Sequence, residues 1–186
     1  MSSHHRHSQP VVHVLEPRLL LDALDPLSQP RFVNELPIPA IMAPTTPGGT
    51  HYEVSISQFE QDLGLVDPLT GESLLTTVWG YNGSYPGATF EARRDVPISV
   101  LWTNDLIESG QPLNHLLPVD TSIHWADPAG YPDSGVPVVT HLHGGHSESA
   151  SDGLPEAWFT PNFAQVGPDW VKATYNYSND QQAATL

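Results

Sequence analysis

Apolar and polar residues alternate along several short stretches of the chain. The alternation is clearest at residues 52–56 and 96–102, where the even-numbered positions are apolar. A period of two residues is typical of a β-strand that buries one of its faces. Together with less regular apolar stretches, this pattern predicts strands over residues 52–56, 74–81, 96–102, 137–143 and 172–177.

Turn-forming residues separate these stretches. The dipeptide Asn82-Gly83 is a strong turn signal, and residues 104–135 are expected to be mostly loop because prolines recur there. The chain has 19 prolines and 14 glycines, and no long stretch repeats with the 3.6-residue period of a helix. We therefore expect an all-β chain, folded from about residue 50 as an antiparallel Greek-key β-sandwich or barrel.

Residues 1–30 are expected to form a disordered leader, because prolines interrupt them repeatedly. Residues 15–22 resemble a short motif near the N-termini of some bacterial surface proteins, which hints at export. If the initiator methionine is removed, Ser2-Ser3-His4 offers a free amine, two backbone amides and an imidazole, a square-planar nitrogen set that Cu(II) prefers. A leader without a metal-binding role is the alternative.

The charge of the chain restricts its partners. Asp and Glu number 21 against six Lys and Arg, giving a formal net charge of −15, and such a surface repels nucleic acid and anionic membranes. No stretch approaches the roughly 20 apolar residues of a membrane span. The chain has no cysteine and ten histidines, so a metal would have to bind through His, Asp or Glu.

The densest group of metal-binding side chains is the motif His141-Leu142-His143. On a strand, residues two apart point to the same face and lie roughly 6.5–7 Å apart along the chain. Two imidazoles at this spacing suit two neighbouring ions better than chelation of one ion. Imidazole is a ligand for Cu, Zn, Fe and Ni. A pair of histidines without a metal, on the surface or in the core, is the alternative.

Longer motifs resemble those of bacterial spore-coat-type laccases and the related bilirubin oxidases, which are multicopper oxidases. That family carries H-L-H-G-G and, after a short variable loop, S-D-G-x-P-E-A-W. Both strings are present here in order, at residues 141–145 and 151–158. Further resemblance is found at residues 32–39, 79–87, 102–106 and 175–177, so that the similarity extends over roughly residues 31–186.

The resemblance implies a cupredoxin-like fold and a copper cofactor. Enzymes of this family take single electrons from phenols, bilirubin-like pigments or metal ions and reduce O₂ to water at a three-copper cluster. His141 matches the position that binds the type 2 copper, and His143 matches a position that binds a type 3 copper. Asp152 matches an acidic residue near the type 2 copper, where it could relay protons or orient a ligand. A simple turn residue before Gly153 is the alternative for Asp152.

The chain also departs from the family pattern. The W-Y-H-D-H motif that follows the Y-N-Y strand in the family is absent, as are the later histidine motifs and the cysteine that binds the electron-accepting copper. We therefore expect residues 31–186 to be an N-terminal cupredoxin domain that lacks its last strands and is inactive alone. Its partners would be the missing C-terminal cupredoxin domains, with O₂ and a small-molecule electron donor in the intact enzyme.

Two other functions fit parts of the sequence. A cupin-type metal protein is suggested by Gly135, His141, His143 and Glu148, which match much of the first cupin motif, although no second motif follows. A non-catalytic acidic surface protein that kept the fold is the other possibility. The missing second motif disfavours the cupin. The surface protein is distinguished from the multicopper oxidase fragment by whether a partner chain or downstream coding sequence supplies the missing ligands.

Overall fold

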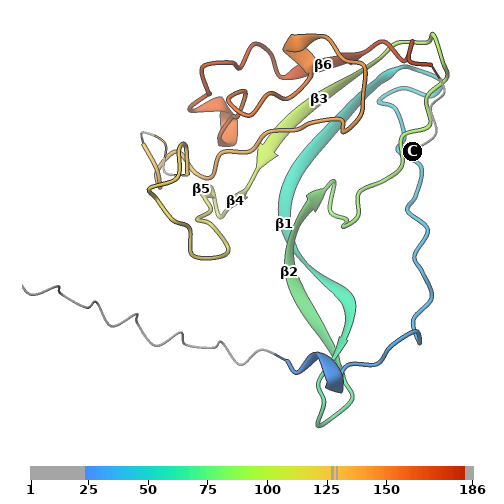
Figure 1. Cartoon of the computed structure of the whole chain (residues 1–186), viewed down its shortest axis with the longest axis vertical. Coiled ribbons are helices and arrows are strands. Elements are labelled where there is room, and N and C mark those ends of the chain that lie inside the picture. The colour runs from blue at the N-terminus through green and yellow to red at the C-terminus, as the bar shows by residue number, and fades with distance from the viewer. Residues whose placement is uncertain (1–23, 127, 129, 183–186) are drawn as a thin grey trace, which may run out of the picture.

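The computed structural model describes residues 24–126, 128 and 130–182, and within them the regular structure consists of strands and single 3₁₀ turns. Four strands form one sheet in the order β2-β1-β3-β6, and two short strands, β4 and β5, form a second pair. Figure 1 shows the larger sheet curling around one side of the molecule. The elements are η1 (Pro26–Ser28), β1 (His51–Val66), β2 (Ser73–Tyr81), β3 (Ile98–Asp105), β4 (Ile107–Glu108), β5 (Gln111–Pro112), η2 (Ser149–Ser151), η3 (Pro161–Phe163) and β6 (Thr174–Tyr177).

The sheet confirms the expected all-β, cupredoxin-like class, but one pairing is not antiparallel. β1 pairs with β2 in antiparallel fashion and with β3 in parallel, from His51 opposite Ser99 to Ser57 opposite Asp105. The reason lies in the connection over residues 82–97, which carries the chain past β1 so that β3 joins the opposite edge. Local alternation identifies a strand but does not say which edge of the sheet it joins.

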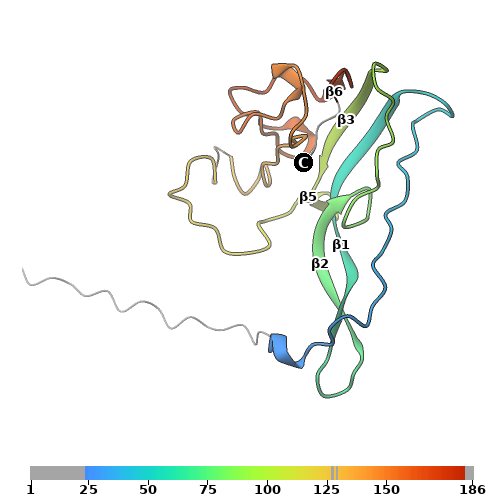
Figure 2. The ribbon, with the colours of Figure 1, turned by 45° about the vertical axis from the view of Figure 1, so that its right-hand side comes forward.

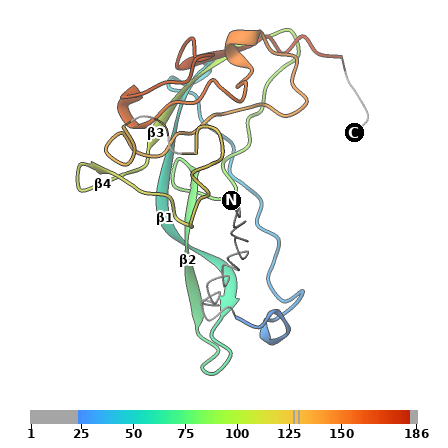
Figure 3. The same cartoon turned by 60° about the vertical axis from the view of Figure 1, so that its left-hand side comes forward.

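The long hairpin of β1 and β2 extends well beyond the expected strand over residues 52–56. Its outer part pairs residues 58–66 with residues 73–79, and the register shifts between Asp62 and Leu65, where Gly64 has a φ of 82°. Figure 3 shows the hairpin reaching away from the segments that gather around β3 and β6. Near its far end the Gln29 side chain bonds the backbone of Val66 at 3.0 and 2.9 Å.

The expected strand over residues 137–143 does not form, and this prediction was wrong. Only Val138 pairs, through an isolated bridge to Phe159 with N···O distances of 3.0 and 2.8 Å. Beyond Val138, the backbone up to His143 has no ladder partner among the described residues. An alternating apolar pattern can therefore produce an extended segment without a strand, because a strand also needs a neighbour to bond.

The expected alternation does place the core on one face of the sheet. The strand registers put Tyr52, Val100 and Tyr175 side by side, and Val54 beside Trp102. All five side chains are buried. Segments that follow β5 cover this face: Figure 2 shows residues from about 135 to 170 collected beside β3 and β6. The main buried cluster consists of Met42, Tyr52, Val54, Val100, Trp102, Phe159, Tyr175 and Tyr177.

Some expectations concern the chain ends. The expected Ser2-Ser3-His4 copper site and most of the expected leader lie outside the described residues, as do residues 183–186. Residues 24–30, expected to lack regular structure, contain the single turn η1, which the Asp25 side chain caps by accepting from the Leu27 N–H at 2.9 Å. In the described part of the chain, no helix is both long and apolar enough to span a bilayer.

One buried amide ties β3 to the segments that cover the sheet. Asn104 is 5% exposed, and its Nδ2 donates to the carbonyls of Val136 at 2.9 Å and Phe159 at 3.1 Å. Its Oδ1 accepts from the N–H of Leu106 at 3.1 Å. The side chain therefore satisfies three backbone groups from three different segments, all in the interior.

Replacing Asn104 should destabilise the fold strongly. Asn104→Ala leaves the buried Val136 carbonyl and the Leu106 N–H without this partner, and each such loss costs about 1–3 kcal/mol. The Phe159 carbonyl keeps its bond from the Val138 N–H. We expect the free energy of unfolding, measured by urea denaturation, to fall by about 2 kcal/mol or more. The matched control is Asn34→Ala at an exposed position, where a change within about 0.5 kcal/mol is expected. Equal effects of the two variants would contradict the role of Asn104.

Candidate metal centre

The candidate centre lies on the segment that follows the Val138–Phe159 bridge. Thr140 is buried, whereas His141, Leu142 and His143 are exposed. His141 and Leu142 continue the extended backbone, and His143-Gly144 form a turn closed by the Gly145 N–H, which donates to the carbonyl of Leu142 at 3.0 Å. The two histidines are thus presented by an anchored loop and not, as expected, by a strand.

The imidazole of His141 is oriented by the backbone of a second loop. Its Nδ1 lies in hydrogen-bonding contact with the carbonyl oxygen of Asp152. A carbonyl only accepts, so Nδ1 must carry the proton and Nε2 of the neutral ring keeps its lone pair. The His141 side chain is 45% exposed, so Nε2 is available to a ligand. Histidines that bind metals commonly donate their other nitrogen in this way.

His143 lies next to His141 at a spacing that suits two neighbouring ions. The two ring centroids are 6.2 Å apart and the ring planes are nearly perpendicular, at 88°. The separation is close to the spacing expected from the H-x-H pattern, although the local backbone is not a strand. Each ring can therefore offer one nitrogen to a different ion.

Asp152 approaches His141 through its backbone more closely than through its side chain. The carboxylate Oδ1 lies 3.8 Å from Nδ1 of His141, beyond hydrogen-bonding distance, and the side chain is 31% exposed. The carbonyl of the same residue makes the contact that orients the ring. The carboxylate is thus partly exposed and makes no direct hydrogen bond to His141, and its expected role in proton relay stays a prediction.

Gly153 brings the Asp152 loop against the histidine segment. Gly153 has a φ of +69°, and a Cβ built on it would lie 1.7 Å from the carbonyl oxygen of Thr140 and 3.1 Å from Cα of His141. Only a residue without a side chain allows this contact. Steric contact therefore explains the glycine in the S-D-G string: Gly153 allows the Asp152 carbonyl to reach the His141 ring.

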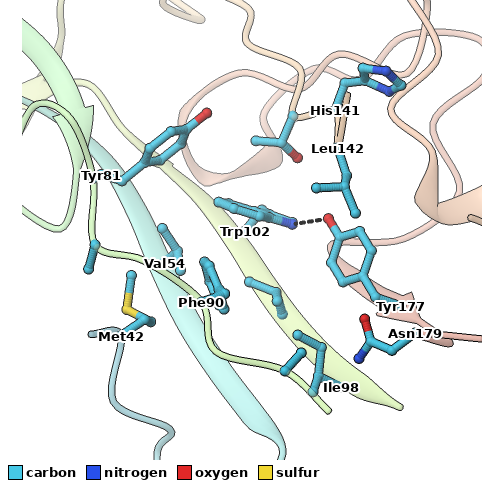
Figure 4. A pocket seen from close by; sticks show the side chains of 15 residues that line it. Met42, Val54, Tyr81, Phe90, Ile98, Trp102, His141, Leu142, Tyr177 and Asn179 are labelled. Carbon is cyan, nitrogen blue, oxygen red and sulfur yellow. Dashed lines mark hydrogen bonds between the residues drawn. The ribbon is translucent and has the colours of Figure 1, made fainter. Parts of the chain in front are cut away.

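An apolar cavity of about 440 Å³ lies beside the same segment. Figure 4 shows Leu142 directed toward Tyr177 at its border, with the His141 ring pointing away. Trp102 Nε1 donates to the Tyr177 hydroxyl at 3.2 Å, and burial raises the pKa of Tyr177 to about 12. The phenol is therefore neutral at physiological pH, and this cavity has no charged wall that would bind an ion.

The residues present fit copper as ligands but do not complete a site. Imidazole nitrogens are suitable ligands for copper, and His141 already has the tautomer that leaves Nε2 free. Within the described ranges, no three His, Asp or Glu side chains come close enough to hold one metal ion. The cupin arrangement is not formed either, since Glu148 faces Lys172 instead of the histidines.

Three other histidines of the described residues have partners away from the pair. His115 Nε2 lies 3.2 Å from the carbonyl of Ala126, and His124 Nε2 lies 3.2 Å from Glu156 Oε1. The exposed His146 pairs with Asp180 at 3.0 Å. His115 and His124 carry no recognisable ligand spacing in the sequence, and their contacts are with a backbone carbonyl and a loop carboxylate. Trp158, from the same motif, is buried and packs on Trp125.

Sequence reasoning missed a polar network behind the Asp152 loop. Glu148 Oε1 accepts from the Ser151 hydroxyl at 2.8 Å, from Asn176 Nδ2 at 3.2 Å and from Lys172 Nζ. The hydrogen bond from Lys172, followed by those from Ser151 and Asn176, lowers the pKa of Glu148 to about 2. In the sequence, Glu148 stands out only as part of the cupin-like motif, and no spacing connects it with Lys172, 24 residues later.

The contact of Gly153 with the histidine segment can be tested by comparing two glycines. Gly153→Ala should destabilise the chain by about 2 kcal/mol more than Gly144→Ala, because overpacking adds to the backbone strain that both changes share. Gly144 also has a positive φ, 72°, but nothing lies within 4 Å of the position that a Cβ would take there. Urea denaturation of the two variants measures the difference. Equal losses would show that the Thr140 carbonyl does not restrict position 153.

Comparison with known proteins finds laccases and other multicopper oxidases. No family model matches the chain. The chain is 42% identical to a laccase of Bacillus stratosphericus over 159 residues and 39% identical to a laccase of Bacillus subtilis (strain 168) over 158 residues, in both cases 84% of this chain. It is 40% identical to the Arabidopsis thaliana multicopper oxidase LPR1 over 116 residues, which is 60% of this chain and 19% of that protein.

The matched region is a minor part of these relatives. The chain spans 28% of the length of each Bacillus laccase. Copper is the cofactor that these relationships imply, and the imidazoles of His141 and His143 are suitable ligands for it. The extent of the identity, together with the all-β fold, shows that the chain belongs to the multicopper oxidase family.

Proposed function

We propose that residues 31–186 are the N-terminal cupredoxin domain of a multicopper oxidase and that residues 1–30 are a leader. In the complete enzyme, electrons from a phenolic, pigment or metal donor would reduce O₂ to water. This chain would contribute His141 and His143 to the copper cluster, and other cupredoxin domains would supply the remaining ligands. By itself the chain would be inactive.

The orientation of His141 carries the proposal. Its Nδ1 is held by the Asp152 carbonyl and its ring is accessible, so the free Nε2 is ready to bind a metal ion. The ring of His143, 6.2 Å away, is placed for a second ion. The coverage of 28% of the Bacillus laccases supports a protein in which further segments complete the centre.

Each residue of the centre has a distinct task in this proposal. Copper, when bound, supplies one-electron redox chemistry. His141 is the ligand of the type 2 ion and His143 a ligand of a type 3 ion. Because O₂ reduction consumes protons, the partly exposed carboxylate of Asp152 is suited to take a proton from solvent and hold it near the cluster.

Copper binding by the isolated chain tests the ligand assignment. The N-terminal amine is first acetylated, which removes the expected Ser2-Ser3-His4 site. With two imidazoles and no third ligand in the described part, Cu(II) should then bind weakly and substoichiometrically, as measured by titration with electron paramagnetic resonance. His141→Ala combined with His143→Ala should reduce this binding at least several-fold. The control His124→Ala, at a histidine that pairs with Glu156, should leave it unchanged. Equal binding by the double variant and the control would contradict the assignment.

The same preparation tests whether the chain is active alone. We expect no oxidation of a phenol and no O₂ uptake by the copper-loaded chain, because most cluster ligands and the electron-entry site lie elsewhere. An oxygen electrode with 2,6-dimethoxyphenol measures both. Phenol turnover coupled to O₂ uptake would overturn the proposal that other domains are required.

The origin of the missing ligands is a prediction about the gene. The coding sequence beyond residue 186, in frame or shifted, or an adjacent gene should encode Trp-Tyr-His-Asp-His or a close variant, then further cupredoxin domains with a His-Cys-His segment. Sequencing this region is the test. Unrelated sequence in all three frames and in the neighbouring genes would favour a non-catalytic acidic β-domain instead.

A further inference from the structure

The ring of His141 is oriented by a backbone carbonyl, so the position of that carbonyl must itself be fixed. The carbonyl belongs to Asp152, which follows directly on the turn η2 (Ser149–Ser151). A shift of this turn would move the carbonyl away from Nδ1. The orientation of the ring therefore depends on the interactions that hold η2 in place.

N-terminal to Asp152, the turn η2 is attached to β6 through Ser151. Ser151 is fully buried, and its hydroxyl oxygen accepts from the backbone N–H of Asn176 at 2.9 Å. The same hydroxyl donates to Glu148 Oε1 at 2.8 Å. The Ser151 hydroxyl thus donates its proton to Glu148 and accepts a hydrogen bond from β6. Loss of the bond to Glu148 would therefore also disturb the bond to β6.

Glu148 is the residue on which these contacts converge. A single carboxylate oxygen, Oε1, accepts from the Ser151 hydroxyl, from Asn176 Nδ2 and from the ammonium of Lys172. These donors come from η2, from β6 and from the segment that leads into β6. The low pKa of Glu148, about 2, reflects the same three donors, so the carboxylate is charged at neutral pH.

On the other side of Asp152, Gly153 packs directly on the Thr140 carbonyl. The loop around Asp152 is therefore fixed at both ends: by the Glu148 network before it and by the glycine contact after it.

We infer that Glu148 is a positioning residue for the metal centre: by anchoring η2 to β6 it holds the Asp152 carbonyl at Nδ1 of His141 and thereby selects the tautomer in which Nε2 is free. The functional consequence rests on the proposed role of His141 as a copper ligand. The structural effect does not, because it exists without a metal ion.

The tautomer of His141 can be measured directly in the metal-free chain. Long-range ¹H–¹⁵N correlation spectra of ¹⁵N-histidine-labelled protein, recorded at mildly alkaline pH, distinguish the Nδ1–H form from the Nε2–H form. In the unmodified chain the Nδ1–H form of His141 should dominate. In Glu148→Ala the spectrum should shift toward the Nε2–H form, which free imidazole side chains prefer. A purely structural role would lower stability without changing the tautomer.

Two further variants define the specificity of this effect. Glu148→Gln keeps one oxygen that can accept all three bonds and should largely retain the Nδ1–H form. Glu60→Gln, in which the altered carboxylate accepts from Thr77 on the β1–β2 hairpin, should leave His141 unchanged. If Glu148→Ala does not fold, Lys172→Met serves in its place: it removes one donor from a partly exposed position and should shift the tautomer in the same direction.

The outcomes separate this inference from the proposed function. An unchanged His141 tautomer in folded Glu148→Ala, or in Lys172→Met if the former does not fold, overturns the inference. A separate measurement tests the proposed function: in the unmodified chain, added Cu(II) should broaden the Nε2 resonance of His141. A dominant Nδ1–H form without broadening by Cu(II) would refute the ligand role of His141 and leave the role of Glu148 in positioning intact.

Discussion

The buried amide of Asn104 is the interaction on which the arrangement of this domain most depends. It lies at the end of β3 and bonds the backbones of Val136 and Phe159, which belong to the segments covering the sheet. Two residues beyond Val136, Val138 pairs with Phe159 in an isolated bridge. Because buried backbone groups must find partners, this one side chain fixes how the histidine-bearing segment leaves the core.

The contacts of the segment that Asn104 holds determine the geometry of the candidate centre. The segment passes from Val138 through the buried Thr140 to the exposed His141. Gly153 then brings a second loop against Thr140, and the carbonyl of Asp152 meets the imidazole. The Glu148 network holds that loop from the other side. The orientation of a single ring thus depends on contacts among residues 104, 138, 140, 148 and 153.

The distribution of polarity suits a centre that is completed by other segments. The histidine pair is exposed at the surface of the domain, and the neighbouring cavity of about 440 Å³ is lined mainly by apolar side chains. A surface that combines exposed histidines with apolar residues favours contact with further protein. This agrees with relatives in which the matched region is 28% of the polypeptide.

The sequence by itself determined the all-β class, the buried face of the strands and the family. The alternation at residues 52–56 and near Val100 specifies which side chains turn inward, because side-chain direction has a period of two along any strand. The H-L-H-G-G and S-D-G-x-P-E-A-W strings identify the candidate ligands His141 and His143, because their residue types and spacing are local properties.

Only the tertiary structure decided how these parts come together. The parallel pairing of β1 with β3 depends on the path of residues 82–97, and the absence of a strand at residues 137–143 depends on whether a neighbouring strand is available. The tautomer of His141 depends on a carbonyl 11 residues away. The anchor of that carbonyl joins Glu148 to Lys172 and Asn176, 24 and 28 residues away. Such contacts have no local pattern, because they arise only when the folded backbone brings distant segments within hydrogen-bonding distance.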